Sequence, residues 1–414
     1  LFQFPPDPVK VGGGWYPFTV RVVDCAGNSV LDGTVVTLTS SLGTIAPTVS
    51  TTANGTVLAT FRSGCIADWA VISATVDSRT FTTTLLIEPG VPRGVSIVIW
   101  PTTIPNCGGR AVITVTLRDE CFNLVKDDTK VELTPQYGYV RISPEVAYTR
   151  RGVVTATVIA HGEKGIAAHD WPTALEQIVV RSLPVVQSEN LYIRPGAPQY
   201  ISLWASPEEI PILGDVNGYD ITVVAALADC SRTAVSDGTT VRLETTKGFF
   251  RESGVWWVDR TTVGGWVTAT LTSQSVGGRV TITATSGSAV GTANVYFQPG
   301  DPWEIWVWPY PEVICADGSS KSLITAQVFD YYNNDVGPGV TVTFRTDFGQ
   351  FLGGGDTCVT TTSEGGYAFC TLVSDRVPRT ATVLVTTENM RHNSCEVHFK
   401  ECRYFYLPMI LRRR

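Results

Sequence analysis

The sequence has no long apolar run and little clustered positive charge. Its longest apolar stretches fall well short of the roughly 20 residues that a membrane-spanning helix needs. The net charge is −7 at pH 7, and the basic residues are scattered, apart from Arg412, Arg413 and Arg414. Such a chain lacks the continuous basic surface that follows a phosphate backbone. We therefore expect neither a membrane span nor a nucleic-acid partner.

Residue patterns typical of catalytic and metal sites are also scarce. The chain has four histidines and no HExxH, GxSxG, P-loop or Rossmann pattern. Two Asx-rich segments, Asp215–Asp220 and Asp330–Asp335, could bind calcium, but such turns are common without metal. Alternating Trp303, Trp306 and Trp308 could bind a sugar, although we expect core or interdomain packing. We expect no enzyme activity, no cofactor and no metal site.

Ten cysteines occur without a CxxC pair, which favours disulfides formed in an oxidising compartment. The chain starts at Leu1 and shows no leader-like segment, so we expect that a signal peptide has been removed. These observations together predict an extracellular protein at the cell surface.

Thr, Val, Gly and aromatic residues dominate, and apolar residues alternate with Thr or Ser in most segments. A period of two is the pattern of half-buried β-strands, so the fold class is predicted to be all-β. A length of 414 residues is too long for a single core and suggests three or four domains.

One unit recurs four times along the chain. In each copy an apolar run such as 18–23 is followed by an aspartate, and a valine stands six residues after it. A glycine follows each aspartate by nineteen residues, and a further glycine opens a strand such as 56–61, with Val57, Ala59 and Phe61 on its core face. The aspartates are Asp24, Asp119, Asp229 and Asp330, and the two sets of glycines are Gly43, Gly138, Gly248 and Gly349, then Gly55, Gly152, Gly265 and Gly366.

Each of the first three copies closes with a Pro–Gly joint, at 87–90, 193–196 and 297–300. Units of about 100 residues with some seven short strands are typical of immunoglobulin-like β-sandwiches. We predict four such domains in a rod, followed by one extra C-terminal strand. Their ranges are 1–90, 91–196 with an insertion near 162–175, 197–300 and 301–402, with the strand at 403–414.

The repeats resemble the bacterial immunoglobulin-like repeats of invasin- and intimin-type surface proteins. In that family a D-x-x-G-N-x-V turn precedes a G-V-T-V-T-F strand, as in Asp24–Val30 and Gly339–Phe344. The third copy departs from this pattern, with Arg232 and Thr233 where Gly and Asn are usual. The resemblance covers residues 1 to 400, and it implies an extracellular structural role without naming a ligand.

The C-terminal tail has the form of a first strand without a domain behind it. Copies two to four open with an apolar run that ends at or near a proline, and Tyr404–Pro408 has this form. Burying a large apolar side chain stabilises by about 1.5 to 3 kcal/mol, so the tail should find a sheet. The predicted donor residues are Tyr404, Phe405, Tyr406, Leu407, Met409, Ile410 and Leu411.

The N-terminal segment resembles a shortened first strand, and this segment of another copy could accept the tail by β-strand addition. Repeated head to tail, such a contact gives a filament. Alternatively, the tail folds back on copy four or serves as a secretion or anchoring tag. The predicted acceptor residues are Leu1, Phe2, Phe4, Val9 and Val11.

Cysteine positions predict bonds across the domain joints. Cysteines in the turn after the second strand lie at the end of a sandwich that faces the preceding domain, too far from its other end for a disulfide. The predicted pairs are Cys65–Cys121 and Cys107–Cys230, with Cys358–Cys370 inside copy four. Cys25 is left over, and we predict an intermolecular bond from Cys25 to Cys315, or else to Cys402.

The sequence thus predicts a subunit of an extracellular filament, assembled head to tail from copies of itself by terminal strand exchange and an intermolecular disulfide. The alternative is a monomeric surface adhesin or stalk that binds host or cell-surface ligands.

Overall fold

The computed structural model describes residues 1–212 and 219–402. The predicted donor strand, with Tyr404–Leu411, lies outside the described residues, as do Asp215 and Asn217. The described part consists of strands, turns and one 3-10 turn, η1 (Ala168–Asp170). Among these residues no helix is long and apolar enough to cross a membrane.

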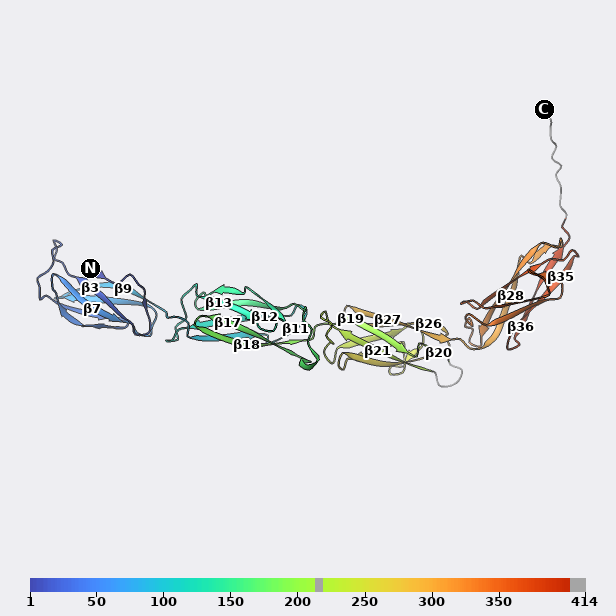
Figure 1. The fold of residues 1–414 in the computed structure, drawn as a ribbon, viewed down its shortest axis with the longest axis horizontal. Helices are drawn as coiled ribbons and strands as arrows, with labels where there is room; N and C mark the ends of the chain where they lie inside the picture. Colours follow the sequence, from blue (N-terminus) through green and yellow to red (C-terminus); the bar gives the residue numbers. More distant parts are fainter. Residues whose placement is uncertain (213–218, 403–414) are drawn as a thin grey trace, which may run out of the picture. The chain divides into compact units, whose positions relative to one another are not determined.

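The strands form eight sheets, a four-stranded and a five-stranded sheet for each copy of the repeat (Figure 1). The first copy contains β1 (Phe2–Gln3), β3 (Trp15–Arg21), β7 (Thr56–Arg62) and β5 (Thr44–Ala46), facing β2 (Val9–Lys10), β9 (Arg79–Glu88), β8 (Trp69–Val76), β4 (Val35–Ser40) and β6 (Val49–Thr51). The second contains β10 (Gly94–Trp100), β12 (Arg110–Arg118), β16 (Val153–Ala160) and β14 (Val140–Ser143), facing β11 (Thr103–Pro105), β18 (Val185–Arg194), β17 (Ala174–Ser182), β13 (Lys130–Pro135) and β15 (Val146–Tyr148).

The third and fourth copies repeat this order. The third contains β19 (Tyr200–Ser206), β21 (Asp220–Ala228), β25 (Trp266–Thr272) and β23 (Phe249–Phe250), facing β20 (Glu209–Pro211), β27 (Ala289–Gln298), β26 (Gly278–Ser286), β22 (Thr240–Thr245) and β24 (Trp257–Thr261). The fourth contains β28 (Pro302–Tyr310), β30 (Lys321–Asp330), β34 (Tyr367–Val373) and β32 (Gln350–Phe351), facing β29 (Val313–Cys315), β36 (His392–Lys400), β35 (Arg379–Thr387), β31 (Thr341–Thr346) and β33 (Thr357–Thr361).

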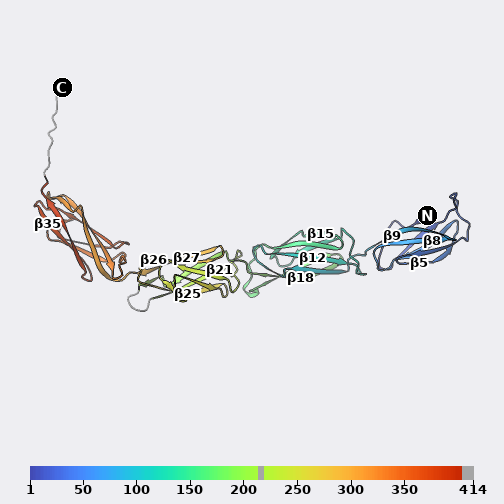
Figure 2. The ribbon, with the colours of Figure 1, turned by 180° about the vertical axis from the view of Figure 1, so that it is seen from behind.

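In every copy the first strand is divided between the two sheets. Its first part pairs antiparallel with the second strand, as β10 does with β12. Its second part crosses over and pairs parallel with the last strand, as β11 does with β18. This order is that of an immunoglobulin-like sandwich, and the two layers can be followed from both sides (Figures 1 and 2). The prediction of four tandem immunoglobulin-like sandwiches is confirmed.

By its contacts the chain forms two compact units. The first is Leu1–Ala197 together with the turn Asp229–Thr233, and the second is Pro198–Ala228 together with Ala234–Arg414. The four predicted domain boundaries stay predictions.

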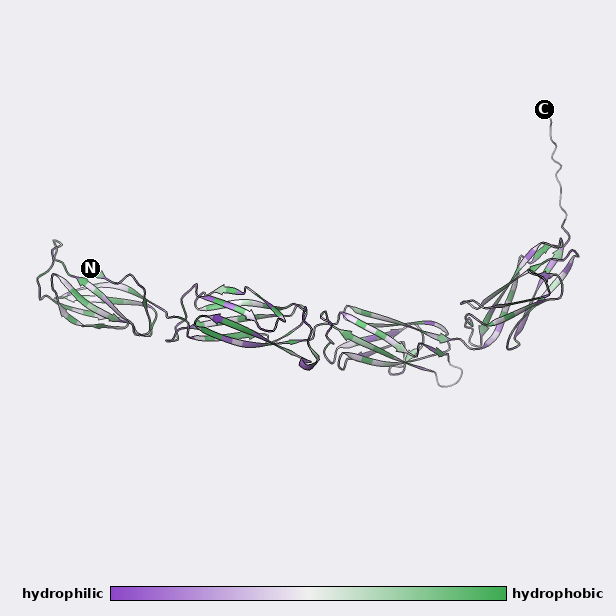
Figure 3. Ribbon diagram, viewed as in Figure 1, coloured by the Kyte–Doolittle hydropathy of each residue, from purple (hydrophilic) through white to green (hydrophobic). Residues whose placement is uncertain are grey.

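Each sandwich encloses its own cluster of buried apolar side chains. Along β7, Val57, Ala59 and Phe61 are at most 2% exposed, as their alternation predicts. Hydrophobic and hydrophilic residues are interspersed along the strands of all four sandwiches (Figure 3). Burial at period two therefore places one face of each strand against the core and the other face toward the outside of the sandwich.

The first sandwich differs from the others where its first two strands begin to pair. β10 pairs with β12 as far as the residue before Asp119, whereas β1 has two residues and β3 ends at Arg21, three residues before Asp24. The apolar run 18–23 therefore belongs to β3 (Trp15–Arg21) only as far as Arg21.

Candidate functional site at the domain joints

The aspartate of each repeat folds the following turn around its own carboxylate. In the second copy Asp119 Oδ1 accepts hydrogen bonds from the backbone N–H groups of Cys121 and Asn123, both at 2.9 Å. A short acidic side chain is suited to this because it reaches the N–H groups two and four residues ahead. The same bonds form in all four copies, and we call residues 24–28, 119–123, 229–233 and 330–334 the Asp turns.

In three copies the second carboxylate oxygen holds the Pro–Gly joint in front of the sandwich. Gly90 N–H donates to Asp119 Oδ2 at 2.9 Å. A buried carboxylate needs such donors, because desolvation without partners costs several kcal/mol. The contact recurs at the next two joints, from Gly196 to Asp229 at 2.9 Å and from Gly300 to Asp330 at 3.0 Å, and the three aspartates are at most 3% exposed.

The last residue of the Asp turn contacts a loop of the preceding sandwich, namely the loop that follows β7, β16 or β25, which corresponds to the loop after β34 in the fourth copy. We call this loop the trailing loop; it spans 63–68, 161–173, 273–277 and 374–378 in the four copies. Asn123 Nδ2 donates to Cys65 O at 2.9 Å, and Asn123 Oδ1 accepts from Ala67 N–H at 3.3 Å. Asn334 makes the same two contacts with Ser275 O at 2.7 Å and Gly277 N–H at 2.9 Å.

The third copy makes the contact with a hydroxyl group in place of the amide. Thr233 Oγ1 accepts from Ile166 N–H at 2.8 Å, and Asn106 Nδ2 donates to Ser231 Oγ at 3.1 Å. The departure from the family pattern at Thr233 therefore keeps the acceptor that the trailing loop requires.

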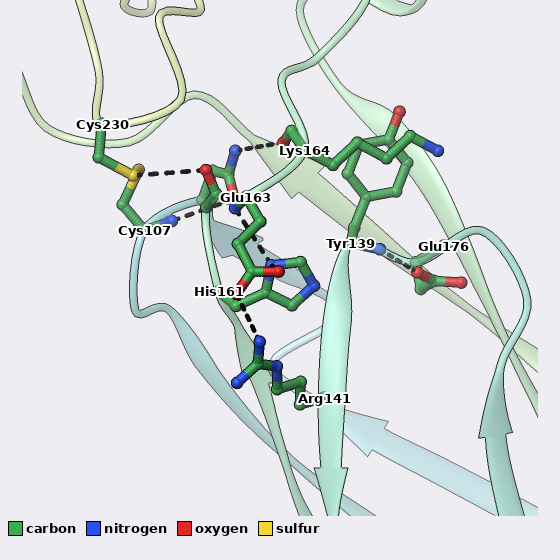
Figure 4. Close-up of polar contacts among 10 residues, drawn as sticks. Cys107, Tyr139, Arg141, His161, Glu163, Lys164, Glu176 and Cys230 are labelled. Carbon is green, nitrogen blue, oxygen red and sulfur yellow. Dashed lines mark hydrogen bonds and ion pairs between the residues drawn. A yellow bond between two sulfur atoms is a disulfide. The ribbon is translucent and has the colours of Figure 1, made fainter.

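Two of these joints are also closed by disulfides, between the residues that the sequence predicted. Cys65 is bonded to Cys121 and Cys107 to Cys230, with Cα–Cα distances of 5.1 and 6.0 Å. Figure 4 shows the second bond beside the loop that carries His161, Glu163 and Lys164. The hairpin bond Cys358–Cys370 is present as well, at 6.4 Å. At the last joint Tyr331 takes the place of the cysteine after Asp330.

The predicted intermolecular bond from Cys25 to Cys315 or Cys402 is wrong, because Cys315 and Cys402 are bonded to each other. The cause is the parallel register of β29 with β36, in which Cys315 lies beside Lys400. This register brings the Cα atoms of Cys315 and Cys402 to 5.3 Å.

The two remaining cysteines, Cys25 and Cys395, are free and lie in contrasting surroundings. Cys25 is exposed in the first Asp turn, while Cys395 is half-buried in β36 against the fourth core. Burial raises the pKa of the Cys395 thiol to about 11. Since the thiolate is the reactive form, Cys395 is the inert thiol and Cys25 is the accessible one.

The insertion of the second copy, which contains η1, also packs on its own sandwich. Lys164 Nζ lies 4.2 Å from the centre of the Tyr139 ring and donates to Tyr137 O at 2.7 Å (Figure 4). The carboxylate of Glu176, which is fully buried, accepts from Tyr139 N–H at 2.7 Å and from three more backbone N–H groups, those of Gln136, Tyr137 and Gln177.

The first Asp turn lacks the partners that the other three possess. Among the described residues, Asp24 Oδ2 accepts only the side-chain amide of Asn28, at 3.3 Å. Hydrogen bonds from Asn28, first from its backbone and then from its side chain, lower the pKa of Asp24 below its ordinary value. The carboxylate is therefore ionised at neutral pH and can accept a further N–H group.

An open groove lies next to this turn, beyond the paired residues of β1 and β3. Its volume is about 630 Å³. Its lining includes Leu1, Phe2, Val22, Val23, Cys25 and Phe81. The predicted acceptor residues lie here or behind it: Phe4 stacks on Phe18 at 5.0 Å, and Val9 and Val11 are buried in the core.

The tryptophans of β28 were expected to face the core or a neighbouring domain, and the core expectation is wrong. Trp303, Trp306 and Trp308 are 40–50% exposed, while Ile305 and Val307 face the core. The rings pack edge-on or tilted against Tyr331, Phe329 and Tyr367 on the outside of the sheet. In the described residues no three His, Cys, Asp or Glu side chains gather as a metal site.

The joint contacts were not predicted from the sequence, although the sequence contains a signal for them. The Asp turn was recognised as a turn, but the second oxygen of Asp119 and the amide of Asn123 were not connected with Gly90 and the trailing loop. The recurrence of a Pro–Gly joint about 30 residues before each buried aspartate was the available signal.

Comparison with known proteins adds solved structures only, since no family model and no curated protein matches the chain. Invasin, titled a bacterial integrin-binding protein, is 15% identical with a TM-score of 0.38, covering 96% of this chain and 79% of that one. The Escherichia coli adhesin FdeC is 15% identical with a TM-score of 0.36, covering 76% and 100%. InvD of Yersinia pseudotuberculosis is 16% identical with a TM-score of 0.31, covering 74% and 96%. These likenesses concern the fold alone.

Proposed function

We propose that the chain is a structural stalk of an extracellular surface protein, in which tandem immunoglobulin-like domains are held at fixed joints. The observation that supports this most is the hydrogen bond from a joint glycine to a buried aspartate, which occurs three times. A flexible linker would need no such contact, because Gly-rich segments behave as random coils in water.

The joint disulfides support the same function. Cys65–Cys121 joins the first trailing loop to the second Asp turn. Cys107–Cys230 joins the turn after β11 to the third Asp turn. Disulfides persist in oxidising compartments, which fits a location outside the cell. A stalk of this kind would present a binding region to cell-surface ligands.

Loosening one joint tests the stalk function. We would combine Asp119→Ala with Cys65→Ser and Cys121→Ser in the full chain and measure distances across this joint by single-molecule FRET. We expect a broader distance distribution than in the unaltered protein. The matched control replaces Cys358 and Cys370 by Ser, which removes a disulfide inside one sandwich and should leave the distribution narrow. An unaltered chain as broad as the joint variant would contradict the proposal.

A second candidate function is the filament subunit, assembled head to tail by terminal strand exchange. The short β1 and the open groove beside Leu1 favour it, since they offer an unpaired strand edge to the tail Tyr404–Leu411 of another copy. Deleting Tyr404–Arg414 should abolish filaments seen by negative-stain microscopy while leaving the four sandwiches folded. Native material without filaments would contradict this candidate.

A further inference from the structure

The first Asp turn and the groove beside it carry the parts of a domain joint without a neighbouring domain among the described residues. We propose that this surface binds the trailing end of a further immunoglobulin-like domain of the same repeat type, meaning its trailing loop, its joint glycine and the turn after its short parallel strand, and that Cys25 forms a disulfide with it. The proposal rests on the stalk function and specifies how the stalk would be extended.

Asp24 is the first part of this surface. Its Oδ1 atom accepts from Ala26 and Asn28 N–H at 2.9 Å, as in every Asp turn. In the other three copies the Oδ2 atom also accepts from a joint glycine, whose place beside Asp24 no described residue takes. The carboxylate is exposed, whereas the other three are buried, so an incoming N–H group can reach it.

Asn28 is the second part. It stands where Asn123 and Asn334 stand, four residues after the aspartate. Those two amides each bridge a C=O and an N–H of a trailing loop. Within the described chain the Asn28 side chain contacts only the Asp24 carboxylate. Its amide therefore remains available for the same pair of backbone groups.

Cys25 is the third part, and it indicates which kind of trailing end would fit. It follows its aspartate directly, as Cys230 does, and Cys230 is bonded to Cys107, two residues after the short strand β11. The matching partner therefore carries a cysteine at the position of Cys107. Bond formation joins two thiols and passes two electrons and two protons to a small disulfide such as oxidised glutathione, which leaves as two thiols.

The groove supplies the fourth part, an open strand edge. Leu1 lies across from Arg21, with which it exchanges backbone hydrogen bonds of 2.7 and 2.8 Å. In the third copy Ser202 holds this place, and the two preceding residues, Tyr200 and Ile201, continue the ladder. The groove lies where two such residues of a partner would pair with Val22 and Val23.

The trailing end of the fourth sandwich does not match this surface, so another copy of this chain is not the proposed partner. Counted from the glycine before β7, β25 or β34, Pro378 stands where Ala67 and Gly277 donate their N–H groups, and proline has none. Joint glycine Gly90 lies three residues after Ile87, which pairs with the short parallel strand β2. Cys402 lies at the same place in the fourth copy, three residues after Phe399, which pairs with β29. Cys402 is also bonded to Cys315.

Rebuilding the fourth trailing end in the full chain supplies a defined probe for this surface. We would combine Asp317→Cys, two residues after β29, with Pro378→Gly, Cys315→Ser and Cys402→Gly, in a glutathione redox buffer. We expect a ladder of multiples of 44.8 kDa on a non-reducing gel, and mass spectrometry should place the new bond between Cys25 and position 317. Adding Cys25→Ser should abolish the ladder, and adding Asp24→Ala should slow its formation about tenfold.

A chain fusion tests the same surface with an unaltered trailing end, in case the rebuilt loop does not fold. A second copy of residues 91–201 placed directly before Leu1 keeps the spacing from the joint glycine to the strand. We expect Cys107 of the added copy to be bonded to Cys25, with the native bonds Cys65–Cys121 and Cys358–Cys370 confirming the fold. A Cys25 thiol that remains free to alkylation in both folded proteins would overturn the proposal.

The unaltered chain separates this inference from the two proposed functions. We expect it to form no Cys25-dependent ladder, because its fourth trailing end lacks the joint residues, and such a ladder would overturn our choice of partner. Joint flexibility tests the stalk, and dependence on Tyr404–Arg414 tests the filament, so each can fail without the others.

Discussion

The backbone N–H of Gly196 donates to the Oδ2 atom of Asp229 at 2.9 Å, and both residues are buried. The Oδ1 atom of Asp229 is bonded to Ser231 and Thr233, so one carboxylate connects the entry of the chain with the turn. A single carboxylate therefore accepts hydrogen bonds both from the Pro–Gly joint and from the turn that follows it.

Replacing this carboxylate should loosen the joint. We expect Asp229→Ala to lower the free energy of unfolding by about 2 to 4 kcal/mol, because charge-assisted bonds are lost and buried N–H groups are left without an acceptor. Hydrogen exchange at the Gly196 amide should accelerate. The matched control is Asp24→Ala, whose carboxylate is exposed and which should cost less than about 1 kcal/mol. Equal effects of the two substitutions would contradict this role of the joint contact.

The hydroxyl group of Thr233 gives a finer test of the same contact. Thr233→Val keeps the shape but leaves the Ile166 N–H without its acceptor, which should cost about 1 to 3 kcal/mol. Thr233→Asn restores the residue found at the other Asp turns and should cost less. Hydrogen exchange of the Ile166 amide distinguishes the two, since it should accelerate only in the valine variant.

Much of the fold could be predicted because the turn after the second strand recurs in all four copies. The recurrence places Cys121 and Cys230 at the leading ends of their sandwiches, facing Cys65 and Cys107 of the preceding ones. The Cys315–Cys402 bond could not be predicted, since it depends on a parallel pairing between strands at opposite ends of the fourth copy. Alternation on β28 identified two faces of the strand but not which one is buried. Both faces are apolar there, and the smaller Ile305 and Val307 fill the core while Trp306 lies outside.

The buried carboxylate of Glu176 should contribute about as much to the stability of the second sandwich as Asp229 contributes to the stability of its joint. Its two oxygens accept four backbone N–H bonds, and three of them, from Gln136, Tyr137 and Tyr139, hold the turn between β13 and β14. We expect Glu176→Ala to destabilise by about 3 kcal/mol or more, measured by chemical denaturation. The control is Glu163→Gln, since Glu163 pairs with Arg141 at the surface and should contribute less than about 1 kcal/mol. A small effect at Glu176 would show that water replaces its carboxylate in the turn.

The two free thiols should react at different pH values. With a pKa of about 11, the Cys395 thiol is ionised to only about one part in a thousand at pH 8, while Cys25 is exposed. We expect iodoacetamide at pH 8 to modify Cys25 alone, and Cys395 to react as the pH approaches 11 or when the fold is denatured. Because the folded pKa lies above the ordinary value of 9.0, burial of the neutral thiol stabilises the fold below about pH 9, and this contribution is lost as the pH rises through 11. Mass spectrometry of the alkylated peptides checks the order, and Cys25→Ser provides the control in which no label should appear at pH 8. Rapid labelling of Cys395 in that variant would contradict its placement against the core.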